Sequence, residues 1–308
     1  MADAPELVTV GGAMVDRYYT LSNLPEPDGG SYVRERRDGV GGVAANVASA
    51  AARLGRDTGI VSRVGEDAAG DTVLADLRER GVDTDRVRRG PEESTYSLVF
   101  RADGERMVVT GGESCAALAL AEGDRPYLRD AGVVAATAYV PERAADPLVA
   151  MAEADEVTLA FDLSGPLAEL ADRAMTPATI DRAVGACDLF LAGEVALAAY
   201  LDHHGADDPV AFLRERGVER AALTRGADGA TLLTPDGTLE IDAFDVEVTD
   251  ATGAGDAFLA ALADAWLLDG NSPEEAGRFA AAVAACNCRG DGARGGLPTR
   301  EEALALLR

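Results

Sequence analysis

The 308-residue sequence predicts an α/β fold, in which a mostly parallel sheet is covered by helices on both faces. Short apolar runs alternate with helical stretches, and two segments, 17–37 and 94–110, interrupt this alternation. No linker-like stretch divides the chain, so we expect one domain over residues 1–308. In such folds, ligands bind at the carboxyl ends of the parallel strands.

The expected strands of the main sheet are short and rich in Val, Leu, Ile and Ala. In chain order they cover 7–10, 58–62, 132–137, 157–162, 189–192 and 221–224. In the second interrupting segment, Tyr96, Leu98 and Phe100 alternate with polar neighbours, as in a half-buried strand. Asp103-Gly104 follows them and has the composition of a hairpin turn.

The segment 250–258, Asp-Ala-Thr-Gly-Ala-Gly-Asp-Ala-Phe, carries the strongest functional signal. Val246 and Val248 alternate before it as in a strand, and apolar residues recur at helical spacing after it. We therefore expect a loop between a strand and the N-terminus of a helix.

Small residues at Gly253, Ala254 and Gly255 would leave backbone N–H groups accessible to a phosphate at the positive end of the helix dipole. Asp256 could then accept the proton of an attacking hydroxyl as a general base, although the dipole should lower its pKa. In the alternative interpretation, Asp250 and Asp256 only cap and charge the start of a helix.

This segment resembles the second signature of the PfkB, or ribokinase-like, family of small-molecule kinases, Asp-Thr-x-Gly-Ala-Gly-Asp, with a departure only at Ala251. The first signature is matched at residues 41–46, Gly-Gly-Val-Ala-Ala-Asn. The resemblance implies a ribokinase-like three-layer α/β/α fold. It also implies that segments 17–37 and 94–110 form a small β-sheet lid, for which an ordinary edge hairpin is the alternative.

The resemblance further implies an acceptor site made of Asp16, Gly41, Gly42 and Asn46. Asp16 could accept hydrogen bonds from two substrate hydroxyls, and Asn46 can both donate and accept. The two glycines would let a polyol approach the backbone closely. Val43 stands where many ribokinases have lysine. With valine there, the segment 41–46 is more similar to fructokinase-like or archaeal nucleoside-kinase members.

For the nucleotide, residues 223–230 resemble the Thr-x-Gly-x-x-Gly turn of the family, which is also compatible with a plain hairpin turn. The resemblance implies that ATP phosphates and ribose contact Thr224, Gly226, Asp228 and Gly229. Adenine is then expected beside a helix over 274–288, near Ala281, Val283 and Ala284.

The residues expected to hold Mg²⁺ depart from the family pattern. After the strand 189–192 the family usually carries Asn-x-x-Glu, whereas this chain has Gly-Glu-Val-Ala at 193–196. Glu194 is then the candidate to hold Mg²⁺ through water, with a solvated helix-start acid as the alternative. Asp250, the carbonyl of Thr252 and the loop at Gly292 match where many members bind a monovalent cation, so potassium dependence is a hypothesis.

Composition excludes several classes of protein. The chain has 54 acidic and 28 basic residues and a formal charge of −26, so neither nucleic acid nor an acidic membrane surface is an expected partner. Every basic residue is arginine, and without lysine a Walker-type phosphate loop or a Schiff-base enzyme is excluded. His203 and His204 are adjacent in a polar stretch, which disfavours a histidine hydrolase or metal site. The acid excess resembles that of proteins from salt-loving organisms and predicts a halophilic, haloarchaeal member.

No apolar run approaches the roughly 20 residues of a membrane span, and the first charged residues of the chain are acidic. The four cysteines do not have the spacing of a zinc site or of a redox pair. We therefore expect a cytoplasmic protein.

The predicted function is an ATP-dependent kinase with Mg²⁺, which phosphorylates a hydroxyl of a sugar or sugar-like polyol and could form a homodimer through the lid. One alternative is a nucleoside kinase, with an aromatic slot for the base from Tyr18, Tyr19, Tyr96 and Tyr139. The other is a non-catalytic sugar sensor.

Overall fold

The computed structural model describes residues 4–170 and 174–308, and within these ranges ten strands form the main sheet. All of its neighbouring strands run parallel except at one edge, where β12, β13 and β14 are antiparallel. The short β6 (Val87–Gly90) pairs with the end of β4. From edge to edge the other strands are β14 (Gly237–Ile241), β13 (Ala230–Thr234), β12 (Ala221–Thr224), β11 (Leu189–Gly193), β10 (Leu159–Asp162), β9 (Val133–Thr137), β1 (Leu7–Val10), β4 (Thr58–Gly65) and β5 (Val82–Asp83).

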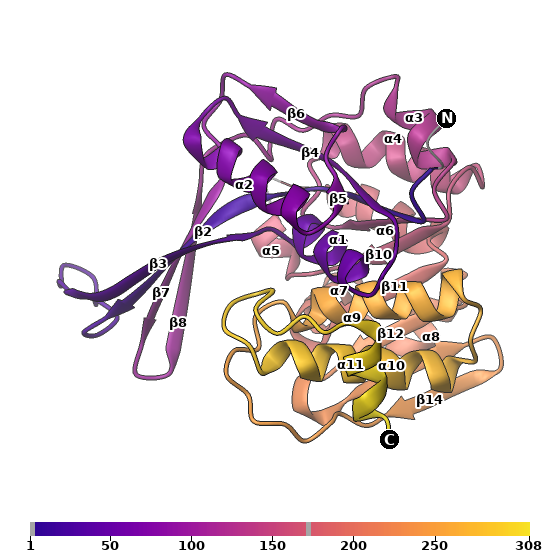
Figure 1. The fold of residues 1–308 in the computed structure, drawn as a ribbon. Helices are drawn as coiled ribbons and strands as arrows, with labels where there is room; N and C mark the ends of the chain where they lie inside the picture. Colours follow the sequence, from indigo (N-terminus) through magenta and orange to yellow (C-terminus); the bar gives the residue numbers. More distant parts are fainter. Residues whose placement is uncertain (1–3, 171–173) are drawn as a thin grey trace.

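Helices cover both faces of this sheet (Figure 1), because successive strand residues point to opposite sides. Along β11, Phe190 and Ala192 join one hydrophobic cluster, while Leu189 and Leu191 join the other. The first cluster includes α3 (Asp124–Arg129), α4 (Glu142–Glu153), α5 (Leu167–Leu170), α6 (Pro177–Ala186), α7 (Glu194–His204) and α8 (Pro209–Glu215). The second includes α1 (Val43–Arg53), α9 (Ala254–Leu262), the π-helical turn η2 (Ala263–Leu268), α10 (Pro273–Cys288) and α11 (Arg300–Leu306). These three layers are the predicted α/β/α architecture.

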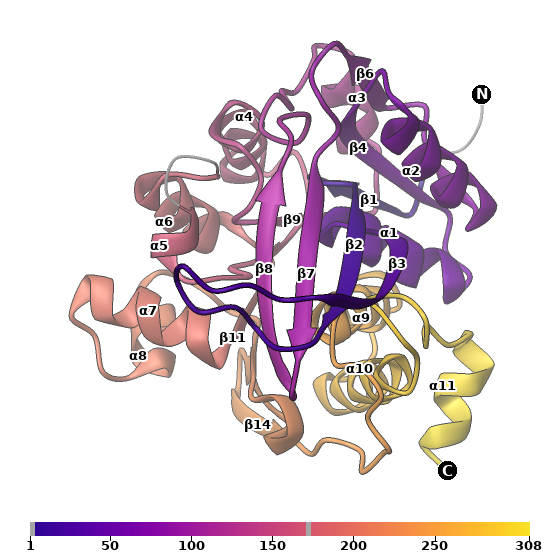
Figure 2. The same ribbon diagram turned by 90° about the vertical axis from the view of Figure 1, so that its left-hand side faces the viewer.

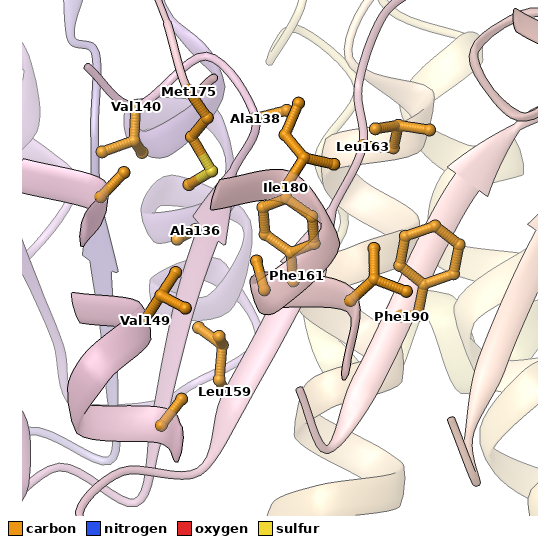
Figure 3. Close-up of a cluster of buried hydrophobic side chains, with 14 of the residues drawn as sticks. Ala136, Ala138, Val140, Val149, Leu159, Phe161, Leu163, Met175, Ile180 and Phe190 are labelled. Atoms are coloured by element: carbon orange, nitrogen blue, oxygen red, sulfur yellow. The ribbon is translucent and has the colours of Figure 1, made fainter. Parts of the chain in front are cut away.

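The first cluster is drawn in Figure 3, where Phe161 and Phe190 from neighbouring strands lie beside Ile180 of α6. The two rings stack with centroids 6.4 Å apart. Burying an aromatic or large aliphatic side chain contributes about 1.5 to 3 kcal/mol relative to leaving it exposed. This packing fixes how far β10 and β11 extend relative to each other, and it therefore positions the residues at their carboxyl ends.

A separate four-stranded sheet projects from the body (Figure 1) and shows its broad face in Figure 2. Its strands, in order, are β3 (Val33–Gly41), β2 (Met14–Leu21), β7 (Tyr96–Ala102) and β8 (Glu105–Gly111), and we call this sheet the lid. β7 and β8 are joined at Asp103 and Gly104, whose φ angles of 52° and 83° are those of the tight hairpin turn expected there. Helix α2 (Ala68–Glu79) packs beside the base of the lid.

The lid strands are longer than the two interrupting segments suggested. β2 begins at Met14 and β3 ends at Gly41, so Asp16 and Gly41 are strand residues at the base of the lid. The lid therefore contributes side chains to the acceptor region.

A strand was expected before the 250–258 loop, but residues 242–249 form no strand and pair with no neighbouring strand. The expectation from Val246 and Val248 was wrong, because this segment is held by the end of a helix: the N–H groups of Thr249 and Asp250 donate to the carbonyl of Cys288 at 2.8 and 3.1 Å. Val248 is 58% exposed, so its alternation with Val246 does not reflect a buried sheet face.

Among the described residues, no helix is both long enough and apolar enough to cross a lipid bilayer.

Candidate active site

Helix α9 begins without a side-chain cap, unlike its neighbour α10. Its N-cap is Gly253, in the left-handed conformation with φ 77°, whereas α10 begins with a complete capping box of Ser272 and Glu275. A Cβ on Gly253 would overlap the backbone carbonyl of Ala293, so only glycine fits this turn. The N–H of Ala254 donates to the carbonyl of Ala251 at 3.2 Å, while no side chain caps the other N–H groups of the first turn, which are available to an anion.

Asp256 lies in that first turn and meets Asn46 of α1. The Nδ2 of Asn46 donates a hydrogen bond to Oδ2 of Asp256 at 2.7 Å. Asn46 is only 6% exposed, and its Oδ1 is buried without a partner in the described part of the chain. The two family-like signatures thus meet in space, and an unsatisfied acceptor lies beside the carboxylate.

Burial raises the pKa of Asp256 to about 7, although the hydrogen bond from Asn46 acts in the opposite direction. The negative charges of Asp162 and Asp16 raise this pKa further. The expectation that the helix dipole would lower the pKa of Asp256 was therefore wrong, because loss of solvation and two neighbouring carboxylates outweigh the dipole.

Asp16, on β2, faces the body from the base of the lid and is 9% exposed. Its Oδ1 accepts from Oγ of Ser97 at 2.5 Å, and its Oδ2 accepts from the hydroxyl of Tyr18 at 3.3 Å. Burial raises the pKa of Asp16 despite these hydrogen bonds. A Cβ on Gly41 would overlap the Asp16 carboxyl group, so glycine is needed to seat it. Gly42 is the N-cap of α1, with φ 95°.

A cavity of about 570 Å³ is lined by residues of the loop, of α9 and α10, and of the turn after β12. Thr224, Gly226 and Gly229 line it, as predicted for nucleotide contacts, and so do Ala254 and Gly255 of the loop. Its remaining lining is mostly small and apolar: Ala227, Ala230, Ile241, Ala243, Phe244, Asp245, Val246, Val248, Ala251, Phe258, Ala281, Ala284, Ala285 and Cys288.

Two residues predicted near the nucleotide do not line this cavity. Asp228 is exposed in the turn η1 (Gly226–Asp228). Val283 is fully buried in the second hydrophobic cluster, because it lies on the face of α10 opposite to Ala281 and Ala284.

Asp250 is 8% exposed, and both oxygens of its carboxylate are occupied by protein donors. Oδ1 accepts from the N–H and the hydroxyl of Thr252 at 3.0 and 2.7 Å. Oδ2 accepts from Nη2 of Arg101 at 2.7 Å and from the N–H of Gly292 at 3.0 Å. Burial alone would raise the pKa of Asp250, but these hydrogen bonds outweigh it and lower the pKa to about 2. The residues predicted to hold a monovalent cation therefore meet, and Arg101 of the lid donates to the same carboxylate.

Glu194 is exposed at the start of α7. In residues 4–170 and 174–308, no group of three or more His, Cys, Asp and Glu side chains is arranged to hold a metal ion by itself. The structure adds a carboxylate at the neighbouring strand end: Asp162 is the last residue of β10, which pairs with β11, and Glu194 directly follows β11. Burial raises the pKa of Asp162 to about 6.

Sequence reasoning missed Asp162, Ser97 and Arg101 as members of this region. Asp162 could have been found, because it is the last residue of a predicted parallel strand, where ligands bind. Ser97 and Arg101 lie on strand β7 of the lid, and their partners Asp16 and Asp250 are 81 and 149 positions away, so no local pattern indicates them.

An uncapped helix start, a paired carboxylate and a nucleotide-sized cavity define a phosphotransferase built on a three-layer α/β/α fold. The chain matches the model of the pfkB family carbohydrate kinases over residues 4–300. It therefore belongs to the pfkB family. It is an ATP-dependent carbohydrate kinase acting on a sugar-like acceptor, which confirms the predicted family and reaction class.

Relatives over the whole length support this assignment. The chain is 33% identical over 98% of its length, and 97% of the relative's, to the ATP-dependent ribose-1-phosphate kinase of Halopiger xanaduensis. It is 28% identical to the nucleoside kinase of Methanothermobacter thermautotrophicus, covering 99% and 96% of the two chains. The structure of Arabidopsis thaliana ribokinase complexed with ribose and ATP superposes with a TM-score of 0.86 at 26% identity, covering 99% of each chain.

Proposed function

We propose that this kinase transfers the γ-phosphoryl group of ATP to a sugar hydroxyl with Asp256 as the general base. The hydrogen-bonded pair of Asn46 and Asp256 beside the uncapped start of α9 carries this proposal. The pair lies between two parts of the site, the nucleotide cavity on one side of the loop and the buried Asp16 on the other. A hydroxyl near Asp16 could thus be deprotonated as it attacks a phosphoryl group at the loop.

The pKa of about 7 suits Asp256 for this role, since a general base works best when its pKa is near the operating pH. The backbone N–H groups of 253–255 would stabilise the negative charge on the transferred phosphoryl group. Such preorganised donors typically contribute about 2.7 to 4 kcal/mol each to transition-state stabilisation.

The acceptor is proposed to bind through Asp16 and Asn46. The Asp16 carboxylate can accept hydrogen bonds from substrate hydroxyls in addition to those from Ser97 and Tyr18. The buried Oδ1 of Asn46 needs a donor, which a substrate hydroxyl can supply. A Cβ on Gly41 would overlap the Asp16 carboxyl group and a Cβ on Gly42 would overlap the carbonyl of Gly12, so glycine is needed at both positions.

ATP is proposed to occupy the 570 Å³ cavity, with its phosphates at Thr224, Gly226 and Gly229 and its adenine against Ala281 and Ala284. The cavity is mainly apolar, as a purine ring requires, and it reaches the loop at Gly255.

Mg²⁺ is proposed to be held by ATP phosphates, water and the carboxylates of Asp162 and Glu194 at neighbouring strand ends. These residues fit Mg²⁺, which keeps several waters and takes only one or two protein carboxylates. When bound, the ion neutralises charge on the phosphates.

The acceptor is proposed to be a pentose or a phosphorylated pentose, because the relative of Halopiger xanaduensis is named for ribose 1-phosphate. A nucleoside is the second candidate, in view of the relative of Methanothermobacter thermautotrophicus. Of the four tyrosines expected to form a slot for a nucleoside base, Tyr19 and Tyr96 lie on the lid face opposite to Asp16, against Phe100 and Arg17, whereas Tyr18 contacts Asp16.

The test is product formation from ATP over a panel of ribose, ribose 1-phosphate, other sugars and nucleosides in concentrated KCl. The proposal expects at least one sugar or sugar phosphate to be phosphorylated with a higher kcat/KM than any nucleoside. Turnover confined to nucleosides would overturn the acceptor assignment, and absence of turnover with every compound would overturn the kinase proposal.

A homodimer through the lid is also proposed. The lid face away from the body carries Met107 and Val109, which are 48% and 49% exposed, beside Phe100 and Leu98. Sedimentation of Met107→Glu/Val109→Glu against the unmodified protein tests this, and an unchanged mass would contradict it.

A further inference from the structure

We propose that Arg101, carried by the lid, supplies the positive charge that neutralises Asp250 beside the anion-binding loop, so that the enzyme needs no monovalent cation. The inference rests on the proposed function of that loop. Arg101 is thus a positioning residue, which acts through Asp250 and the loop.

A buried carboxylate next to a phosphate site requires compensation. Asp250 lies six residues before Asp256 and is 8% exposed, and its negative charge would repel an incoming phosphoryl group. An unpaired carboxylate at such a position is strongly disfavoured. Its lowered pKa, about 2, shows that hydrogen bonds already offset the cost of burial.

The donors to Asp250 leave no place for an ion. A carboxylate offers about four lone pairs. Four donors use them: the N–H and hydroxyl of Thr252, the N–H of Gly292, and Nη2 of Arg101. Of these, only Arg101 carries a charge, and at 2.7 Å it makes a charge-assisted hydrogen bond.

Neighbouring lid residues hold Arg101 in place. Its guanidinium carbon lies 5.2 Å from the ring centroid of Tyr18, whose hydroxyl donates to Asp16. Arg37 stacks on the same ring at 3.8 Å and lies 4.0 Å from the Asp250 carboxylate. Arg106, paired with Arg101 across the hairpin, donates to the hydroxyl of Thr252 at 3.1 Å.

Tyr18 therefore contacts both the carboxylate of the acceptor region and the arginine at the anion loop. A lid that closes on the acceptor would bring Arg101 to Asp250 in the same movement. A free ion could not link these two events, whereas a side chain on strand β7 does. The charge at the loop would then be complete only when the lid is closed.

The test compares the unmodified enzyme, Arg101→Gln and a matched control, Arg34→Gln, which removes an exposed arginine from strand β3 of the same sheet. Each is assayed in KCl and in choline chloride at equal ionic strength. We expect the unmodified and control enzymes to keep the same kcat in both salts within about twofold. Arg101→Gln should lose about tenfold or more of kcat in choline chloride, as when one preorganised donor is removed, and recover part of it in KCl.

A second readout does not depend on activity. K⁺ can bind where the guanidinium has left, so the melting temperature of Arg101→Gln should be higher in KCl than in choline chloride. The unmodified protein should show no such difference. This comparison of melting temperatures remains informative even when no acceptor is phosphorylated. Absence of phosphorylation would count against the proposed function and not against the role of Arg101.

Three results would overturn the inference. One is activation of the unmodified enzyme by K⁺, which decides the matter even when Arg101→Gln does not fold. Another is an unchanged kcat in Arg101→Gln. The third is a raised KM for a phosphorylated acceptor with unchanged kcat and no response to K⁺, which would mean that Arg101 binds a phosphate of the acceptor instead.

Discussion

Asn46 donates a hydrogen bond from Nδ2 to Oδ2 of Asp256 at 2.7 Å, although the two residues are 210 positions apart in the chain. The contact joins the start of α1 to the start of α9, and these helices pack side by side on one face of the sheet. It therefore sets the position of the proposed base relative to the acceptor region.

Asp256→Asn should lower kcat by about 10² to 10⁴, because it removes the group that accepts the hydroxyl proton. The acceptor contacts at Asp16 and Asn46 remain, so the Kd of the sugar should change little. Steady-state kinetics and calorimetric sugar binding measure the two quantities. The control is Asp71→Asn, an exposed acid on α2. Full turnover by Asp256→Asn would assign the base elsewhere.

The pH dependence of kcat/KM should follow the ionisation of Asp256. Since the base acts only when ionised and its pKa is about 7, activity should rise as the pH increases through 7. Asn46→Leu removes a donor that lowers the pKa of Asp256, so this rise in activity should shift to higher pH.

Stability gives an independent check on the same ionisation. The pKa of Asp256 rises on folding from its ordinary 3.8, so its contribution to stability is fully present below pH 3.8 and is lost as the pH rises through 7. Asp256→Asn should therefore raise the melting temperature more at pH 8 than at pH 4. An equal change at both pH values would show that the pKa is not raised by folding.

The parts of the fold that depend on local pattern could be predicted from the sequence. β1 and β12 match the expected bounds because both are short apolar runs bordered by polar residues. The hairpin at Asp103-Gly104 was also predictable from its turn residues. The segment 242–249 was not, because its alternation resembles a strand while its partner is the end of α10.

The site was predictable where a signature fixes the residue and not where distant packing decides. Asp256 and Asn46 could each be proposed from short motifs. The raised pKa of Asp256 could not, since it results from burial and from Asp162 and Asp16, which other strands bring near. Arg101 likewise reaches Asp250 only through the lid.

Gly41→Ala should weaken acceptor binding selectively. A Cβ at this position would overlap the carboxyl group of Asp16, so the carboxylate must move from its place beside Ser97. We expect KM for the sugar to rise about tenfold, the effect of losing one hydrogen bond to a charged group, while KM for ATP is kept. Gly30→Ala is the control, because nothing lies within 4 Å of its added Cβ. Equal changes in both KM values would point to general disruption.

Ala284→Leu should weaken ATP binding selectively. Ala284 lines the proposed adenine cavity from α10, and the added carbon atoms would fill space that a purine ring needs. Overpacking of this kind typically costs about 1 to 3 kcal/mol, so KM for ATP should rise by about tenfold or more with sugar affinity unchanged. Arg278→Leu, at an exposed position of the same helix, is the control. An unchanged KM for ATP would place adenine elsewhere.

The folded state should require high salt. With a net charge of −26, self-repulsion across the surface is strong, and it is screened over only about 3 Å at 1 M salt but over about 30 Å at 0.01 M. We expect the melting temperature to fall steadily from molar to millimolar KCl. Because general screening and not a specific K⁺ site is responsible, NaCl should protect as well as KCl. A melting temperature that does not change with dilution would contradict the halophilic interpretation of this composition.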